Sequence, residues 1–172
     1  GPKPQSLSIK DGYCQDKEDQ LLDSIEWKKN GYLLFNISSF AWSSSCGYFG
    51  NLPESNAFFM DKSFYSALEG FDERFCLPGG GLANLDFYKR ACESLHAETV
   101  LLLGEGTFHQ VHGGIATNAV NSDYIKLAMQ EYCSIKKMKF NPPISNPALF
   151  GRPTRESFPW IALSISSMTQ DR

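Results

Sequence analysis

The spacing of apolar residues along the chain predicts helices alternating with strands. A first helix is expected from Asp16 to Asn30-Gly31, with Leu21, Leu22 and Ile25 on one face. Short apolar and aromatic runs predict strands at 32–38, 56–60 and 98–104. Helical spacing predicts further helices at 62–69, from Leu82 to about residue 95, from Asn121 or Ser122 to about Lys139, and after Thr154. The alternation indicates an α/β fold.

Turn-forming residues divide the chain into three parts. Residues 1–15 are polar and expected to be flexible, and their Gly-Pro start is typical of a scar left by tag cleavage. Residues 16–140 form the predicted α/β domain. Residues 141–172 hold the proline-rich turn NPPISNP and a last helix, with Phe158, Ile161, Ile165 and Met168 on one side, expected to pack on the domain.

Composition excludes several classes of protein. The chain has 172 residues, enough to bury a substantial core, and its 42% hydrophobic content is wrong for a disordered protein. A net charge of −3 gives no electrostatic case for nucleic-acid binding. No apolar run approaches the ~20 residues that a transmembrane helix needs. Five scattered cysteines without a CxxC pair argue against a disulfide framework or a zinc knuckle, and favour a cytoplasmic protein with reduced thiols.

Three consecutive glycines, Gly79, Gly80 and Gly81, precede the helix that is expected from Leu82. Backbone amides at such a helix start can approach an anion. The spacing lacks the signature of a P-loop or of a dinucleotide fold, and a tight turn needing positive φ also explains the glycines. Asp86 and Arg90, four residues apart on one helix, can form a surface ion pair. Alternatively, the carboxylate of Asp86, directly behind the three glycines, points into an open cleft.

Other polar residues lie at the predicted strand ends. His109 and His112 flank the turn after the strand at 98–104 and form a candidate ligand or substrate contact. A metal site needs at least one further ligand, for which Asp86 is the nearest chemical candidate. Glu54-Ser55-Asn56 offers polar groups at the mouth of the second strand, where α/β sheets bind ligands, or else forms an ordinary turn.

Three segments occur in a specific order over roughly residues 52–114: ESNAFFMDKSFYSALEGFDERF, GGGLANLDFYKRA and LLLGEGTFHQVHGG. This order resembles the second, acceptor-side half of family 2-like glycosyltransferases of the GT-A fold. That family has a strand, a short helix ending in a GGFDE turn, a Gly-rich loop opening an acidic helix, then a strand and a histidine. The resemblance implies part of a GT-A-like (Rossmann-like) mixed sheet flanked by helices, with the N-terminal nucleotide-binding half absent.

The resemblance implies a transferase that moves a sugar from a nucleotide-sugar to a glycan or another hydroxyl acceptor. A divalent metal, Mn²⁺ or Mg²⁺, would neutralise the leaving diphosphate. The implied roles are catalysis for Asp86 and Asn84, metal binding for His109, and substrate binding for Glu54, Ser55, Asn56, Gly79, Gly80, Gly81 and His112.

Two departures from the family pattern matter. Ala83-Asn84 stands where many members carry a Glu-Asp pair that includes the catalytic base, and the 172 residues contain no Asp-x-Asp metal motif. We therefore expect the chain to belong to a longer protein or to work with a partner that supplies the donor site. A homo-oligomer is a further expectation. The alternative is a non-catalytic GT-A-derived module for sugar binding or protein contact.

Overall fold

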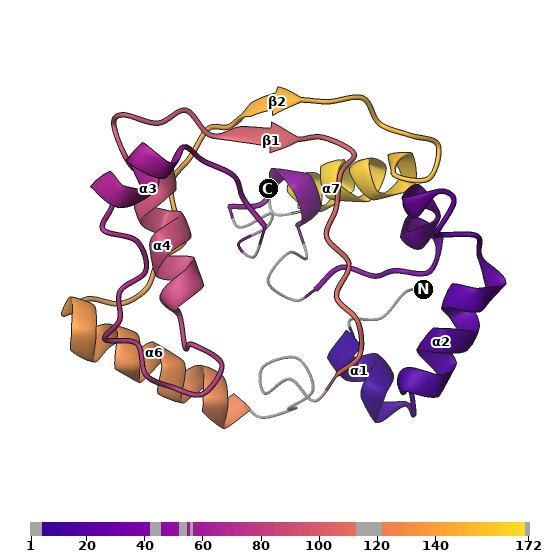
Figure 1. Cartoon of the computed structure of the whole chain (residues 1–172), viewed down its shortest axis with the longest axis horizontal. Helices are drawn as coiled ribbons and strands as arrows, with labels where there is room; N and C mark the ends of the chain where they lie inside the picture. The colour runs from indigo at the N-terminus through magenta and orange to yellow at the C-terminus, as the bar shows by residue number, and fades with distance from the viewer. Residues whose placement is uncertain (1–4, 42–45, 52–54, 56, 113–121, 171–172) are drawn as a thin grey trace.

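The computed structural model describes residues 5–41, 46–51, 55, 57–112 and 122–170 and combines helices with one small sheet (Figure 1). The α-helices are α1 (Gln5–Lys10), α2 (Gln15–Ser24), α3 (Lys62–Ala67), α4 (Ala83–Cys92), α6 (Ser122–Lys136) and α7 (Phe158–Gln170). The 3₁₀ helices η1 (Gly31–Asn36) and η3 (Gly47–Phe49) lie between α2 and α3. The strands β1 (Val100–Leu102) and β2 (Ala148–Phe150) pair in parallel, with Leu101 opposite Leu149. The α/β class is therefore confirmed.

Several predicted elements are present with shorter bounds. The helices expected near residues 16, 62, 82, 122 and 158 correspond to α2, α3, α4, α6 and α7, and the strand at 98–104 corresponds to β1. α3 is followed by two residues with positive φ, Glu69 at 61° and Gly70 at 62°, so the expected stop at Gly70 is confirmed. The differences lie at the helix ends, where terminal turns fray.

The strands predicted at 32–38 and 56–60 are wrong. Residues 31–36 form η1, and the Asn30 side chain accepts a hydrogen bond from the backbone N–H of Tyr32 at 3.1 Å. A short apolar run fits a buried 3₁₀ turn as well as a strand, and this local cap favours the turn. Residues 57–60 have no regular structure. Within the described residues the sheet has only β1 and β2, so the expected mixed sheet flanked by helices is not seen there.

Most buried apolar residues of the described chain form two clusters, and Phe87, Tyr88 and Ala91 on α4 are buried as well. The first contains Phe35, Tyr48, Trp160 and Ile161, and the second contains Phe75, Leu82, Ala128 and Tyr132. Figure 1 shows α3, α4 and α6 on one side of the view and α1 and α2 on the other, with β1 and β2 along the top edge. The chain leaving β1 runs as an extended segment toward α1 (Figure 1). This segment carries the two candidate histidines.

Helix α7 packs against η3 through a face that differs from the predicted one. Trp160, Ile161 and Ser164 are buried, whereas Phe158 and Ile165 are exposed. The side chain of Met168 lies outside the described residues. The cap at Thr154 is confirmed, because its Oγ1 accepts from the backbone N–H of Ser157 at 3.2 Å. Small Ser157 and Ser164 let α7 approach the chain closely, which an apolar periodicity does not reveal.

Two further findings bear on the N-terminal part and on the chain as a whole. Within the segment 1–15, expected to be flexible, residues Gln5–Lys10 form α1. All five cysteines are free. Over the part of the chain that the structure describes, no helix has both the length and the apolar character needed to cross a membrane.

Candidate functional site

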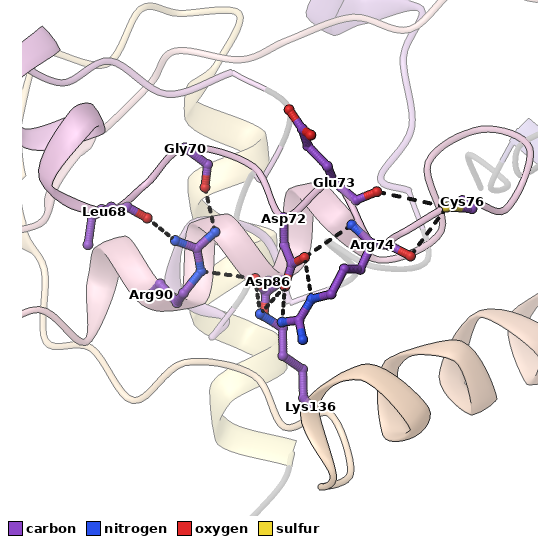
Figure 2. Close-up of polar contacts among 9 residues, drawn as sticks. All are labelled: Leu68, Gly70, Asp72, Glu73, Arg74, Cys76, Asp86, Arg90 and Lys136. Carbon is purple, nitrogen blue, oxygen red and sulfur yellow. Dashed lines mark hydrogen bonds and ion pairs between the residues drawn. The ribbon is translucent and has the colours of Figure 1, made fainter.

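Asp86 is buried on α4 and is held by two cations (Figure 2). Its Oδ2 lies 2.9 Å from Nε of Arg90 and 2.9 Å from Nζ of Lys136, which comes from the last turn of α6. The ion pair expected between Asp86 and Arg90 is confirmed, but it is buried at the carboxylate, where only 3% of the side chain is exposed. A carboxylate enclosed in this way serves to hold α4 against α6.

Arg90 extends this contact to the end of α3. Its Nη1 and Nη2 donate to the backbone carbonyls of Leu68 and Gly70, which follow the helix (Figure 2). Carbonyls at a helix C-terminus lack intrahelical partners, and a guanidinium satisfies two of them at once. The pair Asp86–Arg90 therefore joins three segments: the turn after α3, helix α4 and, through Lys136, helix α6.

Asp72 shares the ammonium of Lys136 with Asp86. Lys136 Nζ lies 2.9 Å from Oδ2 of Asp72, and the guanidinium of Arg74 donates to both oxygens of Asp72 at 2.9 and 2.7 Å. The hydrogen bonds from Arg74, and then from Lys136, hold the pKa of Asp72 well below its usual range. Two acids and three bases thus form one network, which we name the Asp86 network: Asp72, Arg74, Asp86, Arg90 and Lys136 (Figure 2).

The three glycines form a left-handed turn directly before α4. Gly79, Gly80 and Gly81 have φ of 83°, 84° and 55°, so the tight turn with positive φ is confirmed. Glu131 of α6 anchors the preceding chain, because its Oε1 accepts the backbone N–H of Cys76 at 2.8 Å and of Leu77 at 3.0 Å. A Cβ at Gly81 would come within 2.4 Å of Glu131 Oε2, so the carboxylate of Glu131 would have to move to admit a side chain there.

Tyr124 fixes the same turn from the start of α6, since its hydroxyl donates to the carbonyl of Pro78 at 2.6 Å. Gly80 has nothing within 4 Å of a Cβ built on it, so its outer side faces open space. The glycine turn is therefore in contact with α6 on one side and open to solvent on the other, at Gly80.

Two of the predicted site residues meet at the start of α4. Nδ2 of Asn84 lies 3.3 Å from Oγ of Ser55, which it reaches as a hydrogen-bond donor. Both side chains are half-buried. Glu54 and Asn56 lie outside the described residues. The contact joins the segment before α3 to the helix that the glycine turn opens, as expected if both line one site.

His109 and His112 contact each other through their rings. Their Nε2 atoms lie 3.0 Å apart, and their ring centres 4.7 Å apart. Asp86 does not join them as a third ligand: among the described residues, no three His, Cys, Asp or Glu side chains are grouped as a metal site requires. The nitrogen donors suit Mn²⁺ and other transition metals, but not Mg²⁺, which prefers oxygen ligands.

A hollow elsewhere on the surface contains none of these residues. It has a volume of about 440 Å³, lies near the start of α7, and is lined by Asn36, Arg155, Glu156 and Pro159. This hollow is therefore separate from the predicted site around the glycine turn.

Sequence reasoning missed Lys136 and Glu131. Lys136 lies in the last turn of α6, where a cation also suits the helix dipole, so its position gave no reason to pair it with Asp86. Glu131 contacts Cys76 and Leu77, which precede it in the chain by 55 and 54 positions. A single sequence does not indicate contacts across such separations. The general rule that a buried carboxylate has hydrogen-bond donors beside it gives no partner by name.

Comparison with known proteins adds no assignment: no family model matches the chain, and neither a curated protein nor a solved structure shows significant similarity to it.

Proposed function

We propose that the chain is the acceptor-side half of a GT-A-like glycosyltransferase, which transfers a sugar from a nucleotide-sugar donor to a hydroxyl acceptor. The observation that carries the proposal is the order of the segments over roughly residues 52–114. From α3 onward the elements follow in the same order, α3, the FDE turn, the left-handed glycine turn, α4, β1 and the histidine segment, but the strand that the family pattern places before α3 is absent at 57–60. The donor site would come from a longer protein or from a partner.

The open glycine turn and the Asn84–Ser55 contact support a ligand site at the start of α4. Exposed backbone at Gly79 and Gly80 allows close approach of a ligand. The first amides of α4 form the positive end of the helix, which suits a phosphate or a polarised hydroxyl. Asn84 and Ser55 add side-chain donors and acceptors beside it. In this proposal, His109 supports the metal or the diphosphate.

The contacts of Asp86 favour the alternative function, a non-catalytic sugar-binding or protein-interaction module. A general base must reach the hydroxyl proton that it removes. Asp86 is instead buried and bonded to Arg90 and Lys136, and Ala83-Asn84 offers no carboxylate. The module would keep the glycine turn and its polar neighbours for binding while lacking the base.

Calorimetry with UDP-, GDP- and dTDP-sugars in the presence of Mn²⁺ tests the proposal on this chain and on the full-length protein. We expect the full-length protein to bind one donor and to release its nucleotide. Asn84→Ala and Ser55→Ala should lower the release of nucleotide from that donor, whereas Ser63→Ala, on the exposed surface of α3, should leave it unchanged. If the full-length protein binds no nucleotide and releases none from any donor, the proposed enzymatic function is excluded.

We also propose that the protein is cytoplasmic. Five free cysteines, of which Cys14 and Cys76 are exposed, favour a reducing environment, and therefore a cytoplasmic protein.

A further inference from the structure

We propose that the outer edge of β2 pairs with the same edge of a second copy of this chain, so that the two small sheets join into one four-stranded sheet. The two copies meet about a two-fold axis at Leu149, and residues 147–151 form the contact, which we name the β2 edge. The pairing concerns the assembly of the chain and does not depend on sugar transfer.

The backbone of β2 is paired on one side only. The N–H of Ala148 donates to the carbonyl of Thr99 at 2.9 Å, and the carbonyl of Phe150 accepts from the N–H of Leu103 at 2.7 Å. Because backbone groups alternate in direction along a strand, the N–H and the carbonyl of Leu149 point away from β1. Neither group is hydrogen-bonded to another described residue, and Leu149 is 52% exposed. Figure 1 shows β2 at the outer margin of the view.

The β2 edge is complementary to itself when two copies run antiparallel. Its outward groups are, in order, the carbonyl of Pro147, the N–H and the carbonyl of Leu149, and the N–H of Gly151. Read in the opposite direction, this order places a donor against every acceptor. Leu149 then exchanges two hydrogen bonds with its own copy, and each Gly151 N–H donates to a Pro147 carbonyl. Pro147 has no N–H, which ends the pairing there and fixes the register.

The side chains of the β2 edge fit the same register. Phe150 lies opposite Ala148 of the second copy, so that a ring that is 70% exposed covers a small residue at two symmetric places. On the other face, Leu149 lies opposite its own copy. It thereby extends the apolar row of Leu101, which packs against the cluster of Trp160. Pairing therefore covers apolar surface that a single chain leaves exposed.

The distribution of charge favours the β2 edge over the outer edge of β1. Residues 141–151 contain no Asp, Glu, Lys or Arg, so two copies meet there without repulsion between like charges. Native proteins commonly protect an edge strand with a charged side chain, and the β2 edge lacks this protection. Glu98 and Glu105 flank β1, and pairing of two β1 edges would bring the carboxylates of both copies together.

The dimer is expected to be weak and reversible. An edge of five residues buries far less than the roughly 800 Å² per partner of a standard stable interface. We therefore expect a dissociation constant on the order of 10⁻⁴ M.

Sedimentation equilibrium between about 10 μM and 1 mM measures this association. A thiol reductant is present, so that the exposed Cys14 and Cys76 do not link copies covalently. Leu149→Lys and Leu149→Glu should each raise the dissociation constant at least about tenfold, because like charges then lie directly opposite each other. An equimolar mixture of these two variants should associate again. Leu163→Lys is the matched control, because Leu163 on α7 is 50% exposed, and it should leave the association unchanged.

Leu149→Pro tests the backbone pairing separately. It removes the outward N–H, while Ala148 and Phe150 keep their hydrogen bonds to β1, so the dissociation constant should rise at least about tenfold in a protein with unchanged circular dichroism. Association that Leu149→Pro leaves unchanged overturns the proposal, as does a mixture of the Lys and Glu variants that stays monomeric. A parent chain that is monomeric at about 1 mM also overturns it and leaves the β2 edge to a strand of a different protein.

Discussion

A single substitution of Asp86 distinguishes a structural role of this residue from a catalytic one. Asp86→Asn is expected to lower the free energy of unfolding by about 3 kcal/mol, because it leaves the cations of Arg90 and Lys136 beside a buried neutral group. Urea unfolding measures the change. Asp61→Asn is the control, since Asp61 is exposed and makes no side-chain cap at α3, and it should change the value by less than ~0.5 kcal/mol. An Asp86→Asn protein of normal stability that loses only sugar transfer would instead establish a catalytic role.

Gly80 and Gly81 allow a matched comparison within the glycine turn. Both have positive φ, so alanine at either costs about 1–2 kcal/mol of backbone energy. Only at Gly81 does the new Cβ meet Glu131 Oε2, at 2.4 Å, so Gly81→Ala should lose a further ~1–3 kcal/mol. Thermal unfolding of both variants measures the difference. Adding Glu131→Ala to each should abolish the difference; if it persists, the carboxylate does not determine the need for glycine.

At the scale of elements, the docking of α7 depends on one buried hydroxyl. Ser164 Oγ accepts the backbone N–H of Tyr48 in η3 at 3.2 Å and donates to the carbonyl of Trp160 at 2.7 Å. Ser164→Ala leaves that buried amide without its acceptor and should cost about 1–3 kcal/mol. Ser166→Ala, on the exposed side of α7, should cost less than ~0.5 kcal/mol. Denaturant unfolding compares the two, and equal losses would place the stabilising contact elsewhere.

Helices were more predictable than strands because a helix repeats its apolar spacing over several turns. α4 and α6 follow from such spacing, although Leu95, beyond the end of α4, and Leu127 on α6 are exposed. β1 and β2 have three residues each, and β2 follows a proline-rich turn with no alternating pattern. The run at 32–38 became η1 because Asn30 caps it, which shows that a local hydrogen bond can override an apolar run.

The candidate site was predictable where its residues are neighbours in sequence. The positive φ of the glycines and the Asp86–Arg90 pair both depend on local spacing. The contact of the two histidines depends instead on a turn held by Glu18, and the burial of Asp86 depends on Lys136, 50 positions later. These contacts come from tertiary packing, to which a single sequence gives no access.

For the whole molecule, the Asp86 network predicts the response of stability to acid. The pKa of Asp72 is lower in the folded protein than its usual 3.8, so the folded state binds fewer protons than the unfolded state as pH falls. The stabilisation is fully present above about pH 4 and is lost as pH falls below that value toward the lowered pKa. Asp72→Asn should reduce the fall in the free energy of unfolding below about pH 4. Urea unfolding at a series of pH values measures this change.

Asp23→Asn, at an exposed position of α2, is the control for the acid response and should retain the slope of the parent protein. A steeper loss with Asp72→Asn than with the parent would contradict the sign derived above.

The two core clusters are completed at different times during synthesis, because only the first contains Trp160. Its indole N–H donates at 3.0 Å to the carbonyl of Phe35, 125 residues earlier, so the cluster around Phe35 stays incomplete until α7 has left the ribosome. The cluster around Phe75 and Tyr132, with the Asp86 network beside it, has all its buried members by Lys136. A nascent chain should therefore fold its middle before its N-terminal part, the reverse of the usual order from N- to C-terminus.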